Sequence, residues 1–239
     1  MTFEKISNEL QSLSAQQGLA WIASNYPNQA AFSTALNKED QAITHLIGTS
    51  KLAINIFTID TGRLFQESYD LLSATRARYQ VPIQVFFPNA LLVEDMVRQK
   101  GPNSFYESVE NRKECCHVRK IEPLKRALAD VKIWITGIRA AQSANRSTMN
   151  LVEWDSQHNL IKYNPVLDWS HEELELFIAK HHVPVSALHK VGFPSIGCLP
   201  CTRAVLPGED MRAGRWWWET SNKECGLHER SGAVLHQAS

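Results

Sequence analysis

The hydrophobic pattern of the first half of the chain predicts strands that alternate with helices. Short apolar runs, some rich in β-branched residues, have the length of buried strands: residues 30–32, 52–59, 83–87 and 132–136. Between these runs apolar residues recur at helical spacing, and the expected helices lie around 43–47, at 64–79 and at 91–100. The alternation is typical of parallel β-α-β units. We therefore expect an α/β fold, a mostly parallel sheet with helices on both faces.

The pattern also predicts a helix at the N-terminus. Its apolar residues repeat at helical spacing: Phe3, Ile6, Leu10 and Leu13. We expect this amphipathic helix to break near Gly18 and to belong, within residues 1–24, to the same domain as the sheet.

Polar loops follow three of the predicted strands, at residues 33–40, 60–63 and 137–146. The carboxyl ends of parallel strands meet at one edge of a sheet, and ligands of such sheets bind outside that edge. The three loops therefore predict a nucleotide site.

The sequence pattern of alternating strands and helices ends after residue 150. Ser170 and Glu173 have the spacing of a capping box, which predicts a helix that runs to about Lys180. From residue 191 onward Gly, Pro, Cys, Arg and Trp dominate, and hydrophobic periodicity fades. We therefore expect an α/β nucleotide-binding domain at 1–190 and a cysteine-bearing C-terminal segment at 191–239, folded back on the sheet and tied down by metal.

Composition narrows the class of protein. The chain has 239 residues, 44% of them hydrophobic, which is enough for a core without disulfide bonds. Its 25 basic and 25 acidic residues balance, which argues against a nucleic-acid backbone or an anionic membrane as main partner. The longest apolar run, 19–23, is far shorter than the ~18 residues of a membrane helix. The N-terminal stretch has no apolar signal region, so we expect a cytoplasmic protein.

The cysteines indicate a ligand set rather than a disulfide framework. They are Cys115, Cys116, Cys198, Cys201 and Cys225. An odd number, an adjacent pair and a C-x-x-C spacing, in a chain without an export signal, do not fit paired disulfides. They fit four ligands and one further thiol.

The four ligand candidates favour an iron–sulfur cluster over zinc. The C-x-x-C at 198–201 lets two thiolates reach one metal centre, although redox dithiols share this spacing. At a helix start, the adjacent Cys115 and Cys116 could both lean toward one bulky object. A four-iron cluster offers separated corners, whereas zinc needs both sulfurs on one tetrahedron. A buried pair of unliganded cysteines is the alternative.

Cys225 is a candidate nucleophile. Lys223, His228 and Arg230 could favour its thiolate, and Gly226 would allow the tail to move. A lone exposed cysteine is more often incidental than catalytic, and the local sequence alone leaves both interpretations open.

Several segments taken together closely resemble one enzyme family. The segments are ECCHVRKIEPLKRAL, SIGCLPCTRAVLPGEDMRAGRWWWE, KECGLH, FTIDTGRLF and GIRAAQSANR. They resemble the assimilatory adenylyl-sulfate (APS) reductases of the sulfonucleotide (PAPS/APS) reductase family, from about residue 30 to His228. The resemblance implies an adenine-nucleotide α-hydrolase-like fold.

The resemblance also implies a mechanism. Cys225 would attack the sulfur of APS, expel AMP and become an S-sulfocysteine, from which thioredoxin or glutaredoxin would release sulfite. One 4Fe–4S cluster per subunit would be held by Cys115, Cys116, Cys198 and Cys201. Family members that hold the cluster mostly use APS and those without it mostly use PAPS, so we expect APS. The family includes dimers and tetramers, which leaves homo-oligomer formation open.

The resemblance further implies a set of substrate contacts. By family motif these are Ser33, Thr34, Asp60, Thr61, Gly62, Arg63, Lys120, Gly137, Arg139, Arg146, Arg212, Arg215 and His228. Anionic groups need such cations where bonds break. Arg212 and Arg215 would share one helix face if their segment were helical.

The chain departs from the family at the loop that usually reads S-T-S-L-G-A-E-D. Ala35 replaces a hydroxyl and Asn37 a glycine, although asparagine tolerates left-handed backbone and Lys38 could replace lost anion contacts. Ala140 and Ala141 replace an arginine and a polar residue. These changes affect the expected nucleotide contacts and leave the thiol chemistry intact.

Three alternative functions share some of these sequence features. An ATP-using relative would need an S-G-G-x-D-S loop, and the chain has no such string. A PAPS reductase or a dual-specificity enzyme could keep the same metal site. A metal-bound thiol redox sensor would not need the arginines around GRWWWE or the DTGR loop.

Overall fold

In the computed structural model, which describes residues 1–143 and 146–219, the strands form one six-stranded sheet with the order β3-β2-β1-β4-β6-β5. The strands are β1 (Ala30–Ser33), β2 (Asn55–Ile59), β3 (Ile83–Phe86), β4 (Ile133–Ile135), β5 (Val152–Asp155) and β6 (Leu160–Tyr163). All neighbours are parallel except β5 and β6, which form an antiparallel pair at one edge. The expected mostly parallel sheet is confirmed.

The first four strands coincide with the four apolar runs of the sequence. The run at 52–59 forms a strand only from Asn55 onward. The β5–β6 pair was not predicted, because charged residues interrupt the apolar pattern of both strands: Glu153 and Asp155 in β5, and Lys162 in β6. Trp154 on β5 is half exposed, which further obscures the alternation.

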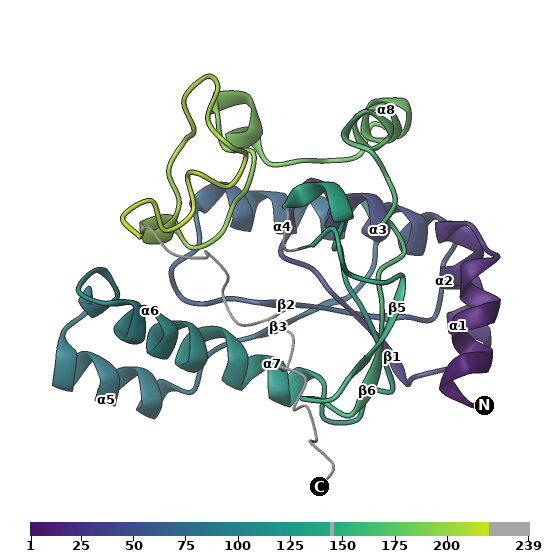
Figure 1. Cartoon of the computed structure of the whole chain (residues 1–239), viewed down its shortest axis with the longest axis horizontal. Helices are drawn as coiled ribbons and strands as arrows, with labels where there is room; N and C mark the ends of the chain where they lie inside the picture. The colour runs from purple at the N-terminus through teal and green to yellow at the C-terminus, as the bar shows by residue number, and fades with distance from the viewer. Residues whose placement is uncertain (144–145, 220–239) are drawn as a thin grey trace, which may run out of the picture.

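Helices cover both faces of the sheet (Figure 1). Ala30 and Phe32 of β1 point into a core shared with α1 (Phe3–Gln11), α2 (Ala15–Asn25) and α3 (Lys38–Thr49). Ala31 points to the opposite face, into a core shared with Leu124 of α7 (Glu122–Ala127). α4 (Gln66–Tyr79) packs on the first face beside α3, and α8 (His171–His181) packs on α3. The predicted arrangement is therefore confirmed.

The N-terminal region contains two helices instead of one that breaks near Gly18. α1 ends at Gln11, and a capping box of Ser14 and Gln17 begins α2. Gly18 lies inside α2, where a Cβ atom would come within 2.1 Å of the Tyr163 hydroxyl. The glycine thus permits close packing of α2 on the sheet, and the expectation that it ends a helix was wrong.

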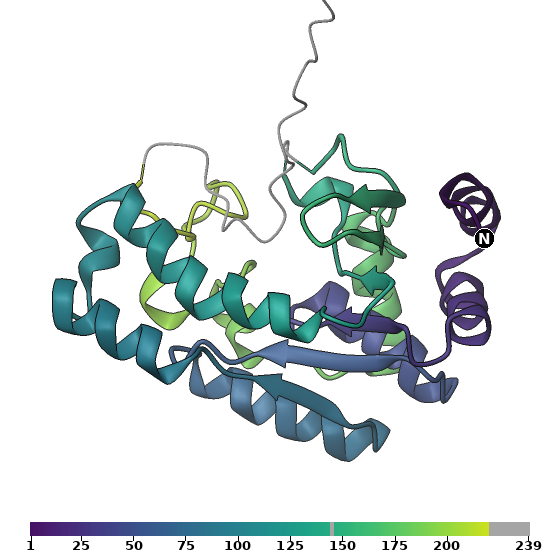
Figure 2. The same ribbon diagram turned by 90° about the horizontal axis from the view of Figure 1, so that it is seen from below.

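Cys115 and Cys116 lie at the end of a helix and not at its start. α5 (Ala90–Lys100) precedes α6 (Val109–Cys116), and the two run together on one side of the sheet (Figure 2). A π-helical turn, His117–Ile121, follows α6 and leads directly into α7. π-Helical turns are rare in proteins, and those that are found often lie at functional sites.

The C-terminal segment folds back over the sheet domain with little regular structure. Its backbone is tied to the loop after β2, because the Leu199 amide donates to the Arg63 carbonyl at 2.8 Å. The Tyr106 hydroxyl donates to the Pro200 carbonyl at 2.7 Å. Turns occupy the region of Arg212 and Arg215, so these arginines do not share a helix face. Within residues 1–143 and 146–219, no helix is both long and apolar enough to cross a bilayer.

Candidate functional site

A cavity opens at the carboxyl end of β1. This strand has β2 on one side and β4 on the other, so the chain reverses its direction of travel across the sheet here. A crevice forms at such a point, and ligands of open α/β sheets bind in it. The cavity is lined by residues that end or follow the three strands: Ser33, Thr34, Thr58, Thr61, Thr136 and Gly137.

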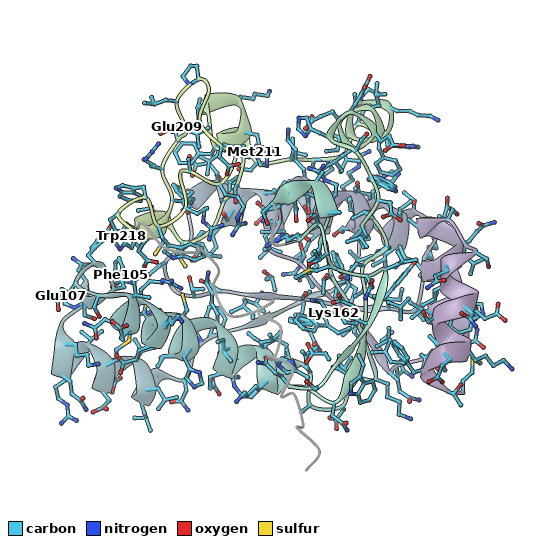
Figure 3. The ribbon with its side chains drawn as sticks, viewed as in Figure 1. Phe105, Glu107, Lys162, Glu209, Met211 and Trp218 are labelled. Carbon is cyan, nitrogen blue, oxygen red and sulfur yellow. The ribbon has the colours of Figure 1, made fainter. Side chains whose placement is uncertain are left out.

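The opposite wall comes from the π-helical turn and the C-terminal segment. It contains Lys120, Cys198, Met211, Arg212 and Arg215. Figure 3 shows Met211 on the C-terminal segment above the sheet. Arg146 and Gln142, which hydrogen-bond to each other, line the cavity from the loop after β4. Hydroxyl groups on one side thus face cations and a thiol on the other.

The loop at 33–40 is closed by Asp40. Its carboxylate accepts hydrogen bonds from the amides of Ala35 (2.8 Å) and Asn37 (3.3 Å). Burial raises the pKa of Asp40 to about 7, although these amide hydrogen bonds act to lower it. The Ser33 hydroxyl accepts a hydrogen bond from the Trp134 indole at 2.8 Å, which fixes its orientation at the cavity edge.

The residues of this loop that differ from the family pattern do not have the roles that the sequence predicted for them. The left-handed residue is Leu36, with φ of 61°, whereas Asn37 is extended and caps α3. Lys38 pairs with Glu175 of α8 at 2.5 Å, so its ammonium serves the packing of α8 and does not line the cavity. The cavity therefore receives its positive charge from elsewhere.

Four thiols gather beside the cavity. Cys116, Cys198 and Cys201 are buried, Cys115 is partly exposed, and none of the four is in a disulfide. Cys198 and Cys201 pack with Phe105, which lies next to Trp218 at 6.2 Å between ring centres (Figure 3). No three Cys, His, Asp or Glu side chains among the described residues are arranged to hold a single metal ion. An iron–sulfur cluster differs from a single metal ion, because each thiolate binds a separate iron atom of the cluster.

The electrostatic environment differs between the thiols. Burial raises the pKa of Cys201 to about 12, with the Cys198 thiolate adding to the effect. Burial also acts on Cys198, but Lys120, the Thr61 hydroxyl at 3.3 Å and Arg215 outweigh it and lower the pKa. The cations thus favour the thiolate form of Cys198, the thiol that lines the cavity, whereas burial disfavours it at Cys115 and Cys201.

Arg119 is a site residue that sequence reasoning missed. Its side chain is buried, and its Nη1 donates to the Thr61 carbonyl at 2.7 Å. Burial raises the pKa of Cys115, and the Arg119 charge opposes this effect; for Cys198 the Arg119 charge adds to the cations that lower the pKa against burial. The Nε of Arg119 has no hydrogen-bond partner within the described part of the chain. The available signal was its position beside Lys120 in CCHVRK, because a π-helical turn can direct neighbouring side chains to one site.

The structure brings together the sequence-predicted residues Ser33, Thr34, Thr61, Lys120, Gly137, Arg146, Arg212 and Arg215, which all line the cavity. It places other predicted residues outside the lining. Arg139 is buried against Glu39 at 3.1 Å, and Arg63 stacks over the Phe105 ring at 5.0 Å. Asp60 accepts from the Gly62 amide at 2.8 Å and so shapes the turn before Arg63. Cys225 and His228 lie outside the described residues.

A mostly parallel sheet with a cavity at its switch point, lined by a hydroxyl-rich loop on one side and by cations and a buried thiol on the other, defines an open α/β protein. One known structure shares this fold: a FMN adenylyltransferase from Candida glabrata, in complex with FMN and an ATP analogue, has a TM-score of 0.53, at 15% identity, over 89% of this chain and 74% of its own. That likeness concerns the fold alone. The chain belongs to the phosphoadenosine phosphosulfate reductase domain family, whose model matches residues 29–204.

Curated relatives extend over nearly the whole chain. Adenosine 5′-phosphosulfate reductase of Sinorhizobium fredii is 46% identical over 98% of this chain and 94% of its own length. The protein of the same name from Allochromatium vinosum is 49% identical over 84% of this chain and 79% of its own. A crystal structure of phosphoadenylyl-sulfate (PAPS) reductase from Candida auris, in complex with phosphate, has a TM-score of 0.71 and 26% identity, covering 85% of this chain and 96% of that one.

Proposed function

We propose that this enzyme reduces adenylyl sulfate (APS) to sulfite and AMP in assimilatory sulfate reduction. One observation carries the proposal: a single cavity at the sheet edge is lined both by the loop after β1 and by Lys120, Arg212, Arg215 and Cys198. A nucleotide in the cavity would therefore bring its anionic groups to the thiol site. The names of the relatives support APS as substrate.

The cations have a definite task in this reaction. Negative charge develops on the phosphate oxygen when the sulfur–oxygen bond of APS breaks, and positive side chains fixed in advance stabilise it. Lys120, Arg212 and Arg215 face the cavity from two different segments, so they can contact neighbouring anionic groups. Arg215 is 7% exposed, and burial strengthens its interaction with an anion.

The thiol chemistry takes three steps. The Cys225 thiolate attacks the sulfur of APS, the bond from sulfur to the phosphate oxygen breaks, and AMP leaves with the electron pair. A thiolate of thioredoxin or glutaredoxin then attacks the Cys225 sulfur, and sulfite leaves with the pair from the sulfur–sulfur bond. A second donor thiol resolves the mixed disulfide, so two thiols are oxidised for each sulfite formed. A cytoplasmic location fits this need for reduced thiols.

The four-cysteine site fits a 4Fe–4S cluster. Cys115, Cys116, Cys198 and Cys201 are all free of disulfides and lie at the end of α6 and in the C-x-x-C turn, within the influence of Arg119 and Lys120. Thiolates are the usual protein ligands of such clusters. When bound, the cluster would organise and polarise the site, while the electrons come from thiols.

Turnover with each nucleotide tests the proposed function. Anaerobically purified protein is supplied with a thioredoxin system and with either APS or PAPS, and sulfite is measured. We expect a kcat/KM for APS roughly 100-fold above that for PAPS. A site whose charged and polar groups match the anionic groups of one nucleotide binds a nucleotide with a different arrangement less well. Equal rates would indicate a dual-specificity enzyme. Absence of sulfite from both, in protein with intact iron and sulfide, would favour the redox-sensor alternative.

A further inference from the structure

A buried ion pair joins the cysteine helix to the last residue that the structure describes. Arg112 of α6 binds Glu219 through two hydrogen bonds, Nε to Oε1 at 2.9 Å and Nη2 to Oε2 at 2.8 Å. The two side chains are 2% and 3% exposed. The pair connects positions 107 residues apart in the sequence. This bidentate arrangement fixes both distance and orientation between its partners.

The surroundings of the pair connect it to both parts of the site. Arg112 and Arg215 both lie over the Trp216 ring, at 4.9 and 4.8 Å from its centre. The Trp216 amide donates to the Cys201 carbonyl at 3.1 Å, and the Glu219 amide donates to the Trp216 carbonyl at 2.9 Å. The turn from Trp216 to Glu219 is thus attached to the C-x-x-C loop at its start and to α6 at its end.

Packing alone does not require charges here. Burying two ions costs the free energy of their hydration. Apolar side chains of similar volume therefore stabilise a fold as well as a buried ion pair does, or better. A bidentate pair, in contrast, accepts one relative placement of its two partners. The placement that it fixes is that of Glu219, from which the chain continues toward Cys225, six residues further along.

We propose that the Arg112–Glu219 pair is a positioning device that anchors the start of the C-terminal segment beside the cavity, so that Cys225 remains within reach of bound APS. The inference rests on the proposed function. Six residues of any chain span at most about 20 Å when fully extended, so the anchor limits how far Cys225 can lie from Glu219. An anchored start therefore keeps the local concentration of the thiol high.

The first test removes the charge of the anchor and keeps its shape. In Glu219→Gln, purified as the iron-containing enzyme, the rate of Cys225 sulfonation by APS in a single turnover without reductant should fall about tenfold. The dissociation constant for AMP and the iron content should stay at wild-type values, because Glu219 does not line the cavity. A structural role alone would lower all three together.

Glu209→Gln is the matched control. Glu209 forms a similar bidentate pair with Arg203, at 2.8 and 2.9 Å, in the same C-terminal segment, but that pair is about one-third exposed and its partners are only six residues apart. The Arg203–Glu209 pair stabilises a local loop and does not fix the start of the tail. Glu209→Gln should therefore leave the rate of Cys225 sulfonation unchanged.

A second variant keeps the ion pair and alters the tail. Six Gly and Ser residues inserted between Glu219 and Thr220 double the length of chain to Cys225, and the rate of sulfonation should fall about threefold, following the −3/2 power of length. This variant tests the tether even if Glu219→Gln does not fold. Wild-type rates in both variants, or a parallel fall of sulfonation, AMP affinity and iron, would overturn the anchor. No sulfonation in the wild-type enzyme would instead contradict the proposed function.

Discussion

The hydroxyl of Thr61 lies 3.3 Å from the sulfur of Cys198. Thr61 follows β2 and Cys198 begins the C-x-x-C turn, so this contact joins the sheet edge to the thiol site. Both residues also line the cavity. The nucleotide cavity and the four-thiol site therefore share one wall, and a change at either is expected to affect the other.

Lys120→Ala should reduce turnover far more than stability. Its ammonium faces the cavity and lowers the pKa of Cys198 against the effect of burial, so its loss removes charge where the sulfate–phosphate bond breaks. We expect kcat/KM for APS to fall roughly 100-fold, and the free energy of unfolding to change by less than about 1 kcal/mol. Lys125→Ala, on α7 and exposed, is the control for loss of a lysine in the same helical region. Equal turnover in the two variants would show that Lys120 only supports the fold.

Cys198→Ala and Cys201→Ala should lose the iron–sulfur cluster. Each variant removes one of the four thiolates that the proposed cluster needs. Iron and acid-labile sulfide per chain are the measurement. Cys225→Ser is the control: it should retain full iron while losing sulfonation. Full iron in either alanine variant would contradict the proposed ligand set.

Gly197→Ala should weaken nucleotide binding through Arg215. A Cβ at Gly197 would come within 2.2 Å of Arg215 Nη2, so the guanidinium must move from its place at the cavity. Loss of one charged contact predicts an AMP dissociation constant about tenfold higher. In Gly208→Ala no atom lies within 4 Å of the new Cβ, although φ is 86°, so only backbone strain is introduced. The two variants separate displacement of Arg215 from general destabilisation, and equal AMP affinities would contradict the account.

Asp40 should make the fold less stable as the pH rises from about 4 to about 7. Burial raises its pKa from 3.8 to about 7, so the folded protein keeps a proton that the unfolded chain releases near pH 4. This contribution is present at low pH and is lost as the pH passes through 7. Asp40→Asn, neutral throughout, should flatten the profile of unfolding free energy in that window. Urea unfolding at a series of pH values measures both slopes, and identical slopes would show that Asp40 does not titrate there.

Sequence patterns were sufficient for the parts of the fold that are locally determined. β1 to β4 were predictable because each is a short apolar run between helices with their own periodicity. Ser170 and Glu173 begin α8 as their spacing indicated, since a capping box is a local interaction. The β5–β6 pair could not be predicted in the same way, because its stability comes from cross-strand pairs such as Val152 with Tyr163.

The side-chain partners within the site depended on tertiary contacts. Arg139 turns toward Glu39 of α3, a residue 100 positions earlier, and no local pattern indicates that choice. Asp40 was within reach of sequence reasoning, because an acidic residue three positions after the Asn37 cap fits a capping box. The role of Arg119 required knowledge that a π-helical turn follows Cys116.

In the proposed reaction Cys225 accepts the sulfo group of APS. The most direct measurement incubates anaerobically purified protein with sulfur-labelled APS, and in parallel with labelled PAPS, without a thiol reductant, and locates the label by peptide mass. We expect label on the Cys225 peptide from APS alone. Label on another cysteine, or no label in protein whose iron and sulfide are intact, would contradict the proposed role of Cys225.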